Sequence, residues 1–123
     1  MVRDLTEHTE ANRINTIQDY KSRTVKLFVQ ERDHIIDHHG IMSNNFDAIY
    51  DSVSNPDSVY KSGSHDTREV FFKNSPYASY SSRFITKTIV EYDDSNEGFI
   101  VTAMPVGKEG GNVGQKLYPE DEL

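Results

Sequence analysis

The sequence contains no cysteine, which excludes a disulfide framework and any metal site built from thiolates. It also lacks any run of about 18 apolar residues, the length that a membrane-spanning helix needs. Residues 1–20 are polar and of mixed charge, unlike a conventional signal peptide. These absences predict a cytoplasmic protein that does not interact with membranes.

Hydrophobic residues make up 35% of the 123 positions, enough for one domain with a compact core. Apolar positions recur with a regular period only in residues 24–104, which we take as the folded domain. Residues 1–23 show no sustained period and predict a flexible N-terminal arm. Glycines and then acidic residues dominate 105–123, which predicts a flexible acidic tail.

The formal net charge is −7, which argues against indiscriminate binding to nucleic acid. Residues 60–90 differ from the rest of the chain, because they carry five basic and only two acidic side chains. This basic middle segment fits either a local anion-binding surface or an ordinary surface of mixed charge.

Two helices are predicted in the first half of the domain. The first covers residues 32–39, with Gly40 as a left-handed C-terminal cap. In the second, Phe46, Ile49, Tyr50 and Val53 recur at helical spacing, Ser43 or Asn44 caps the N-terminus, and Pro56 follows the end.

Strand patterns of period two are found at 24–29, 59–61, 68–73, 83–92 and 99–104, and Pro105 is expected to stop the last of them. We therefore predict an α+β fold with two N-terminal helices packed on an antiparallel sheet of about four strands. The side chains expected to be mostly buried are Phe46, Ile49, Val53, Val70, Phe72, Ile89 and Val101.

Three of the five histidines lie together, at positions 34, 38 and 39. Histidine exchanges protons near neutral pH and binds metals, so the cluster is a candidate for either role, or an amphipathic helix with solvated histidines. His34 and His38 at i, i+4 can share a zinc ion with Asp37. Because no fitting third ligand lies nearby in the sequence, we expect no intrinsic metal and no cofactor.

Several short motifs follow one another in a familiar order. They are His34-Ile35-Ile36 with His39, then Ile49, Val53 and the Pro56-Asp57 turn, then Val70–Lys73 and a hairpin ending at Ile100–Ala103. This order resembles the phage-associated and polymorphic-toxin nucleases of the barnase/EndoU/colicin/RelE-like superfamily, over roughly residues 24–104. The resemblance implies a metal-independent endoribonuclease that cleaves RNA by attack of the 2′-hydroxyl.

The resemblance also implies roles for individual residues. His34 and His39 would transfer protons, with His39 favoured as the acid because it lies at the negative end of a helix dipole. Lys73 would stabilise the phosphorane, and Thr102 would hydrogen-bond the phosphate or the ribose.

Further residues are candidates for holding the RNA. The cations Arg68, Arg83 and Lys87 would contact phosphates, and Tyr77 and Tyr80 would either stack on bases or form a partial lid over the core. The alternative function is a catalytically inactive phage- or toxin-associated module that binds a partner protein, and an immunity protein is one such partner.

Overall fold

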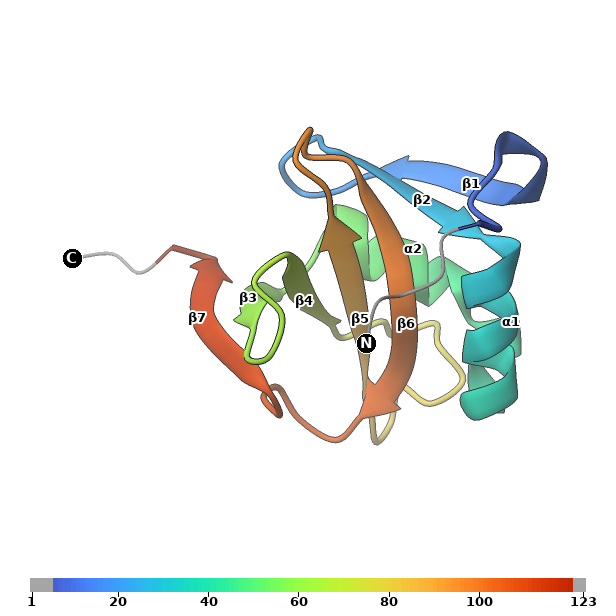
Figure 1. The fold of residues 1–123 in the computed structure, drawn as a ribbon. Helices are drawn as coiled ribbons and strands as arrows, with labels where there is room; N and C mark the ends of the chain where they lie inside the picture. The colour runs from blue at the N-terminus through green and yellow to red at the C-terminus, as the bar shows by residue number, and fades with distance from the viewer. Residues whose placement is uncertain (1–5, 121–123) are drawn as a thin grey trace.

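The computed structural model describes residues 6–120, which form one seven-stranded sheet in the order β1-β2-β6-β5-β4-β3-β7 (Figure 1). The strands are β1 (Arg13–Gln18), β2 (Thr24–Phe28), β3 (Ser58–Ser62), β4 (Arg68–Lys73), β5 (Ile85–Tyr92), β6 (Gly98–Val106) and β7 (Val113–Tyr118). Neighbouring strands are antiparallel except β2 and β6, which pair in parallel at Val25–Gly98 and Lys26–Phe99.

Two α-helices connect β2 to β3. They are α1 (Val29–His38) and α2 (Phe46–Ser54), and short 3-10 turns precede β1 (η1, Glu10–Asn12) and link the helices (η2, Gly40–Asn44). In Figure 1 α2 lies behind the sheet and α1 lies beside β6. Within residues 6–120, neither helix has the length and apolar surface needed to cross a bilayer.

The main core lies between α2 and the sheet. Helix α2 buries Ala48, Ile49, Ser52 and Val53, which share one helix face. The hydroxyl oxygens of Ser52 and Thr88 lie 2.7 Å apart, so a buried hydrogen bond fixes the helix to the centre of β5.

The sheet has a second face, which we call the outer face, on the side away from α2. In β5 the fully or nearly buried positions alternate with half-buried Lys87, Ile89 and Glu91, which point to the outer face. In β2 the core residues Val25 and Leu27 alternate with Lys26 and Phe28 in the same way. The candidate site described below is built on this outer face.

The predicted fold was wrong in several respects. The sheet has seven strands rather than about four, it is mixed rather than antiparallel, and β1 and β2 precede the helices. Strand β1 lies in the predicted arm, whose residues 1–5 are outside the described residues. Strand β7 lies in the predicted tail, of which 121–123 are likewise outside.

Both missed strands are mostly exposed, and each is held by pairing with another strand. Strand β7 contains Gly114, Gln115 and Lys116 and pairs with β3. Strand β1 is also mostly exposed and pairs with β2. A strand that is stabilised in this way leaves little local pattern, because its order depends on residues elsewhere in the chain.

Several predicted details of the helices were also wrong. Gly40 does not adopt a left-handed conformation, because the chain continues from His39 directly into η2. Neither Ser43 nor Asn44 caps α2; the N-cap residue is Asn45, whose amide instead bonds Ile41 and Ser79. The end of α2 before Pro56 is confirmed.

The strands of the β4–β6 region lie close to their predicted ranges. Strand β4 covers 68–73 as predicted, whereas β5 begins two residues late at Ile85. Pro105 does not stop β6, because it pairs with Thr86 and the strand ends at Val106. Of the seven predicted core residues, Ile49, Val53, Val70, Phe72 and Val101 are buried, and Phe46 and Ile89 are half-buried.

Candidate ligand-binding site

A histidine and a buried glutamate meet where β2 runs into α1. Nε2 of His8 and Oε1 of Glu31 lie 2.6 Å apart, and the Glu31 side chain has no solvent exposure. A carboxylate buried in this way needs a hydrogen-bonding partner. Nε2 of His8 is that partner, and the tautomer of its ring decides which atom donates.

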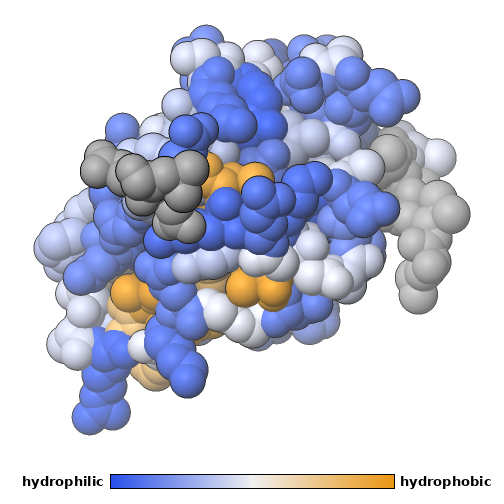
Figure 2. Space-filling view, turned by 90° about the vertical axis from the view of Figure 1, so that its left-hand side faces the viewer, coloured by the Kyte–Doolittle hydropathy of each residue, from blue (hydrophilic) through white to orange (hydrophobic). Residues whose placement is uncertain are grey.

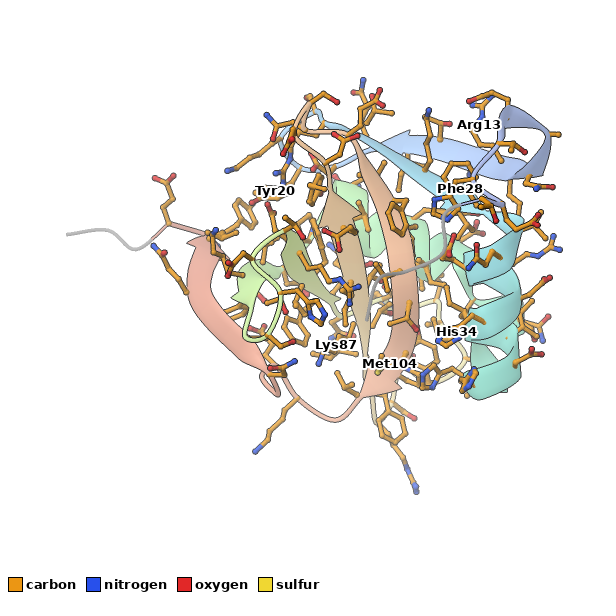
Figure 3. The ribbon with its side chains drawn as sticks, in the orientation of Figure 1. Arg13, Tyr20, Phe28, His34, Lys87 and Met104 are labelled. Carbon is orange, nitrogen blue, oxygen red and sulfur yellow. The ribbon has the colours of Figure 1, made fainter. Side chains whose placement is uncertain are left out.

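Two phenylalanines hold the imidazole of His8. Its ring stacks on Phe28 with centroids 4.2 Å apart and meets the ring of Phe99 edge-on at 4.6 Å. Phe28 ends β2 and Phe99 lies near the start of β6, so the N-terminal segment is fixed across two neighbouring strands. Figure 3 shows Phe28 at the end of the sheet where β2 meets α1.

Next to this histidine the outer face is hollowed by a cavity of about 270 Å³. We call it the acidic hollow. Its lining residues are His8, Lys26, Phe28, Glu91, Tyr92, Asp93, Glu97, Gly98 and Phe99. Three carboxylates thus surround aromatic rings, and Lys26 is the only lysine or arginine in this lining.

The turn between β5 and β6 supplies two of the three carboxylates. Oδ1 of Asp93 accepts hydrogen bonds from the Ser95 hydroxyl and from the backbone N–H groups of Ser95 and Glu97. The hydrogen bond from the Ser95 side chain, followed by the one from the Glu97 backbone, holds the pKa of Asp93 below its usual value. The turn therefore presents an ionised carboxylate at neutral pH.

The cations near the hollow are already paired elsewhere. Nζ of Lys26 lies 3.7 Å from Oε1 of Glu10, which is outside the lining. Among the residues that the structure describes, no ion pair involves Asp93 or Glu97. Glu91, by contrast, accepts from Nε of Arg68 at 2.9 Å. The hollow therefore keeps two carboxylates that are not neutralised by an ion pair.

Tyr92 separates the acidic hollow from a second, closed group of charges, which we call the Arg23 cluster. The guanidinium of Arg23 donates two hydrogen bonds of 2.8 Å to Glu69 and one of 2.7 Å to Asp19. It also lies 4.0 Å from the centroid of the Tyr92 ring. The Tyr92 hydroxyl donates to Asp19 at 2.6 Å.

Burial and charge shift the pKa values in this cluster in consistent directions. Burial, reinforced by the hydrogen bond to Asp19, raises the pKa of Tyr92. Burial of Arg23 by itself would lower its pKa, but the hydrogen bonds to Glu69 and the nearby negative charges outweigh this and raise it. Burial, together with the charge of Glu69, raises the pKa of the adjacent Tyr20 to about 12. The cluster thus keeps a permanently charged arginine and two neutral tyrosines.

Of the two histidines predicted to be catalytic, His34 lies on α1 and His39 directly follows it, and neither lines the acidic hollow. His34 and His38 are exposed and their ring centroids are 4.2 Å apart, while Nδ1 of His38 lies 3.0 Å from the carbonyl oxygen of His34. His39 is half-exposed and follows the last residue of α1. Figure 3 shows His34 toward the end of the molecule where Lys87 and Met104 lie.

The remaining two predicted catalytic residues lie in the sheet. Nζ of Lys73, at the end of β4, is 3.5 Å from Oδ1 of Asp57. Thr102 is half-buried in β6, and its hydroxyl is buried without a hydrogen-bond partner among the described residues. None of the cavities found along residues 6–120 combines either residue with His34 or His39.

The predicted phosphate-binding cations are dispersed and partly neutralised. Arg68 is paired with Glu91, Lys87 donates to the carbonyl oxygen of Gly111 at 3.1 Å, and Arg83 is exposed in the loop before β5. Burial lowers the pKa of Lys87. The basic middle segment of the sequence therefore does not form one cationic surface.

The two loop tyrosines have different environments. Tyr77 is exposed and its hydroxyl donates to the carbonyl oxygen of Asp47. Tyr80 is buried, with its hydroxyl 2.6 Å from that of Thr86. Tyr80 thus belongs to the core, in agreement with the lid alternative, and only Tyr77 is accessible for stacking.

The part of the chain that the structure describes contains no group of three histidine or acidic side chains that could hold a metal ion. Figure 2 looks at the side of β7 and shows mostly hydrophilic residues with small, separate apolar patches. We take the acidic hollow as the candidate site because carboxylates and aromatic rings line the same cavity.

Sequence reasoning missed the residues of this hollow. One signal was present, since Glu91, Asp93, Asp94 and Glu97 put four acids within seven positions next to Phe99. His8 and Glu31 gave no such signal, because a single histidine in a polar segment and a glutamate on a helix are ordinarily solvent-exposed.

The comparisons with known proteins assign no function to this chain, so the candidate site is judged from its geometry. No protein-family model matches the chain, and no curated protein matches it either.

Proposed function

We propose that this domain is a binding module whose acidic hollow receives a positively charged group from a partner protein. The observation that carries the proposal is the lining of the hollow, in which Glu91, Asp93 and Glu97 line the same cavity as the ring of Phe99. Carboxylates attract a cation, and an aromatic face adds a favourable cation–π contact. The net charge of −7 favours encounter with a basic partner.

The expected affinity of one such group is low. An exposed ion pair contributes about 0.2–1 kcal/mol and a cation–π contact at an exposed site about 0.5–1 kcal/mol. Their sum, about 0.7–2 kcal/mol, corresponds to a dissociation constant of roughly 0.03–0.3 M. A partner protein would add contacts around the hollow, with the single cation providing orientation and selectivity.

Titration with charged peptides tests the proposal. The isotope-labelled full chain is titrated with a short peptide containing arginine and lysine, and separately with a peptide of the same length containing glutamate, while amide NMR signals are followed. We expect the basic peptide alone to shift signals of residues 91–99, 26 and 28. Glu97→Gln should weaken this response, and Glu120→Gln, beyond the last strand, should not.

Absence of a response to the basic peptide, or a response centred elsewhere, would contradict the proposal.

We also propose that the protein is located in the cytoplasm, as expected from the sequence. Fractionation of cells that express the full chain tests this location.

Metal-independent RNA cleavage, implied by the resemblance, is the second candidate function. The observation in its favour is that His34 and His39 are both accessible to solvent, as residues that exchange protons with a substrate must be. Against it stand the ion pairs of Arg68 and Lys73, which reduce the positive charge available for phosphates.

An RNase assay in EDTA distinguishes the two functions. If the chain cleaves single-stranded RNA to cyclic phosphate ends, His34→Ala and His39→Ala should each reduce the rate by about 10²–10⁴-fold, and His65→Ala should not. Equal background cleavage by the wild type and both variants would leave the binding module as the better assignment.

A further inference from the structure

The Arg23 cluster shows how this protein already binds one cation. The central carbon of its guanidinium lies 4.0 Å from the centroid of the Tyr92 ring. The same group makes paired hydrogen bonds to Glu69. The rings of Tyr92 and, at 5.8 Å, Tyr20 thus lie beside a single arginine together with two carboxylates. This arrangement depends on the planar, forked shape of the guanidinium, which an ammonium lacks.

The lysines near aromatic rings are held differently. Nζ of Lys21 lies 5.6 Å from the centroid of Tyr20, and Nζ of Lys87 lies 5.9 Å from that of Phe72. Lys87 donates to a backbone carbonyl rather than to a carboxylate. Lys26, which lines the acidic hollow, has its ammonium 3.7 Å from Glu10. It forms no ion pair with Asp93, although the pKa of Asp93 is lowered first by the hydrogen bond from Ser95 and, to a smaller extent, by the positive charge of Lys26.

The acidic hollow repeats the surroundings of Arg23 without the arginine. It shares the residue Tyr92 with the cluster, and it offers the half-exposed ring of Phe99 together with Asp93 and Glu97. Its third carboxylate, Glu91, already accepts from the guanidinium of Arg68. The two cations beside the hollow that donate hydrogen bonds to carboxylates, Arg23 and Arg68, are arginines, whereas the ammonium of Lys26 lies 3.7 Å from Glu10.

We propose that the group received by the acidic hollow is a guanidinium, so that the partner presents an arginine side chain and not a lysine. This inference rests on the proposed binding function and specifies its ligand. The arginine would stack on Phe99 and direct its N–H groups to Asp93 and Glu97. Its weaker hydration would reduce the cost of leaving water relative to a lysine ammonium.

The test compares N-acetyl-arginine amide with N-acetyl-lysine amide. These probes carry the same charge and the same blocked backbone, so a difference between them reports the shape of the cationic group. Both are titrated into the isotope-labelled full chain at low ionic strength, and dissociation constants are taken from the signals of residues 91–99. We expect arginine amide to bind roughly threefold to tenfold more tightly.

Variants identify the groups responsible for the preference. Phe99→Leu keeps an apolar side chain but removes the ring, so the arginine preference should fall toward one. Glu97→Gln should weaken both probes, and Glu120→Gln should change neither. The folding of Phe99→Leu is checked by its amide spectrum, and the comparison of the two probes on the wild type remains decisive if this variant is unfolded.

Three outcomes count against the inference, and they separate it from the proposed function. Equal binding of the two probes, or tighter binding of lysine amide, overturns the guanidinium assignment and leaves a general cation site. Arginine-selective shifts outside the hollow also overturn the assignment. No binding of either probe overturns both the assignment and the proposed function.

Discussion

The Arg23 cluster and the acidic hollow share Tyr92 and contain the same kinds of groups. In the cluster, two carboxylates and two aromatic rings lie around an arginine of this chain, and little of that arginine is exposed. In the hollow, Asp93, Glu97 and Phe99 surround a cavity. In the cluster the cation is an arginine of this chain, whereas Asp93 and Glu97 in the hollow make no ion pair among the described residues.

This difference separates stability from binding. In the cluster, Arg23 donates to Glu69, 46 positions away, which connects the β1–β2 turn to β4. Tyr92 at the end of β5 donates to Asp19 in the same turn, 73 positions away. The hollow also joins distant segments, through the ring contacts of His8 with Phe28 and Phe99, but its carboxylates Asp93 and Glu97 make no ion pair among the described residues. We therefore expect substitutions in the cluster to change the free energy of unfolding, and substitutions in the hollow to change affinity for a cation.

The largest effect should come from removing the arginine of the cluster. Arg23→Ala leaves Glu69 and Asp19 without their shared cation, which should lower the free energy of unfolding by about 3–5 kcal/mol. The measurement is urea denaturation followed by circular dichroism. Arg83→Ala, which removes an exposed arginine, is the matched control and should change stability by less than about 0.5 kcal/mol. Similar values for the two variants would show that the cluster does not stabilise the fold.

A smaller effect is expected from the Tyr92 hydroxyl. Tyr92→Phe removes the 2.6 Å hydrogen bond to Asp19 and keeps the ring that contacts Arg23. A hydrogen bond to a charged group contributes about 1.5–3 kcal/mol, so we expect a loss of that size. Tyr118→Phe at the exposed edge strand is the control.

The same variant also tests the separation between the regions. Because Tyr92→Phe keeps the ring that lines the hollow, binding of arginine amide should stay within about twofold of wild type at a temperature where both proteins are folded. A large loss of binding would mean that the cluster and the hollow act as one unit.

The sequence predicted the parts of the molecule that are governed by local patterns. The apolar spacing of Ile49 and Val53 located α2, and the period of two located β4 and β5. The core face of β5 was assigned wrongly, because Ile89 was expected to be buried and lies on the outer face. The contacts of Arg23 with Glu69 and of His8 with Glu31 join residues that are 46 and 23 positions apart. No local period encodes such pairs, so neither the cluster nor the hollow could be derived in this way.

Counting charges along the sequence also overestimated the positive charge that residues 60–90 offer to a ligand. The basic middle segment was expected to offer phosphate contacts, but Arg68 and Lys73 are paired with Glu91 and Asp57. Their partners lie outside residues 60–90, so the excess charge of that segment is neutralised by its neighbours in the folded chain. A net charge per segment therefore does not describe a surface until the pairing is known.

Salt should distinguish the open region from the closed one. Raising sodium chloride from about 0.05 M to 1 M shortens the screening length from more than 10 Å to about 3 Å. Binding of arginine amide to the exposed carboxylates should weaken several-fold, whereas the stability difference between wild type and Arg23→Ala should change little, because that cation is mostly buried. Equal salt sensitivity of the two quantities would contradict the contrast between the regions.

The smallest effect concerns the protonation of Asp93. Its folded pKa is depressed by hydrogen bonds from Ser95 and Glu97, so its contribution to stability is present above the unfolded pKa and is lost as the pH falls through the folded pKa. Wild type should therefore exceed Asp93→Asn in stability at pH 6, by less than the roughly 1 kcal/mol typical of exposed charged groups. The difference should disappear in strong acid.

Denaturation curves of both proteins between pH 2 and pH 7 measure this dependence, and Asp94→Asn in the same turn serves as the control. A difference that grows on acidification would have the opposite sign from the one expected for a depressed carboxyl pKa. It would show that the turn does not hold Asp93 as an ionised group, and the hollow would then lose one of its two unneutralised carboxylates.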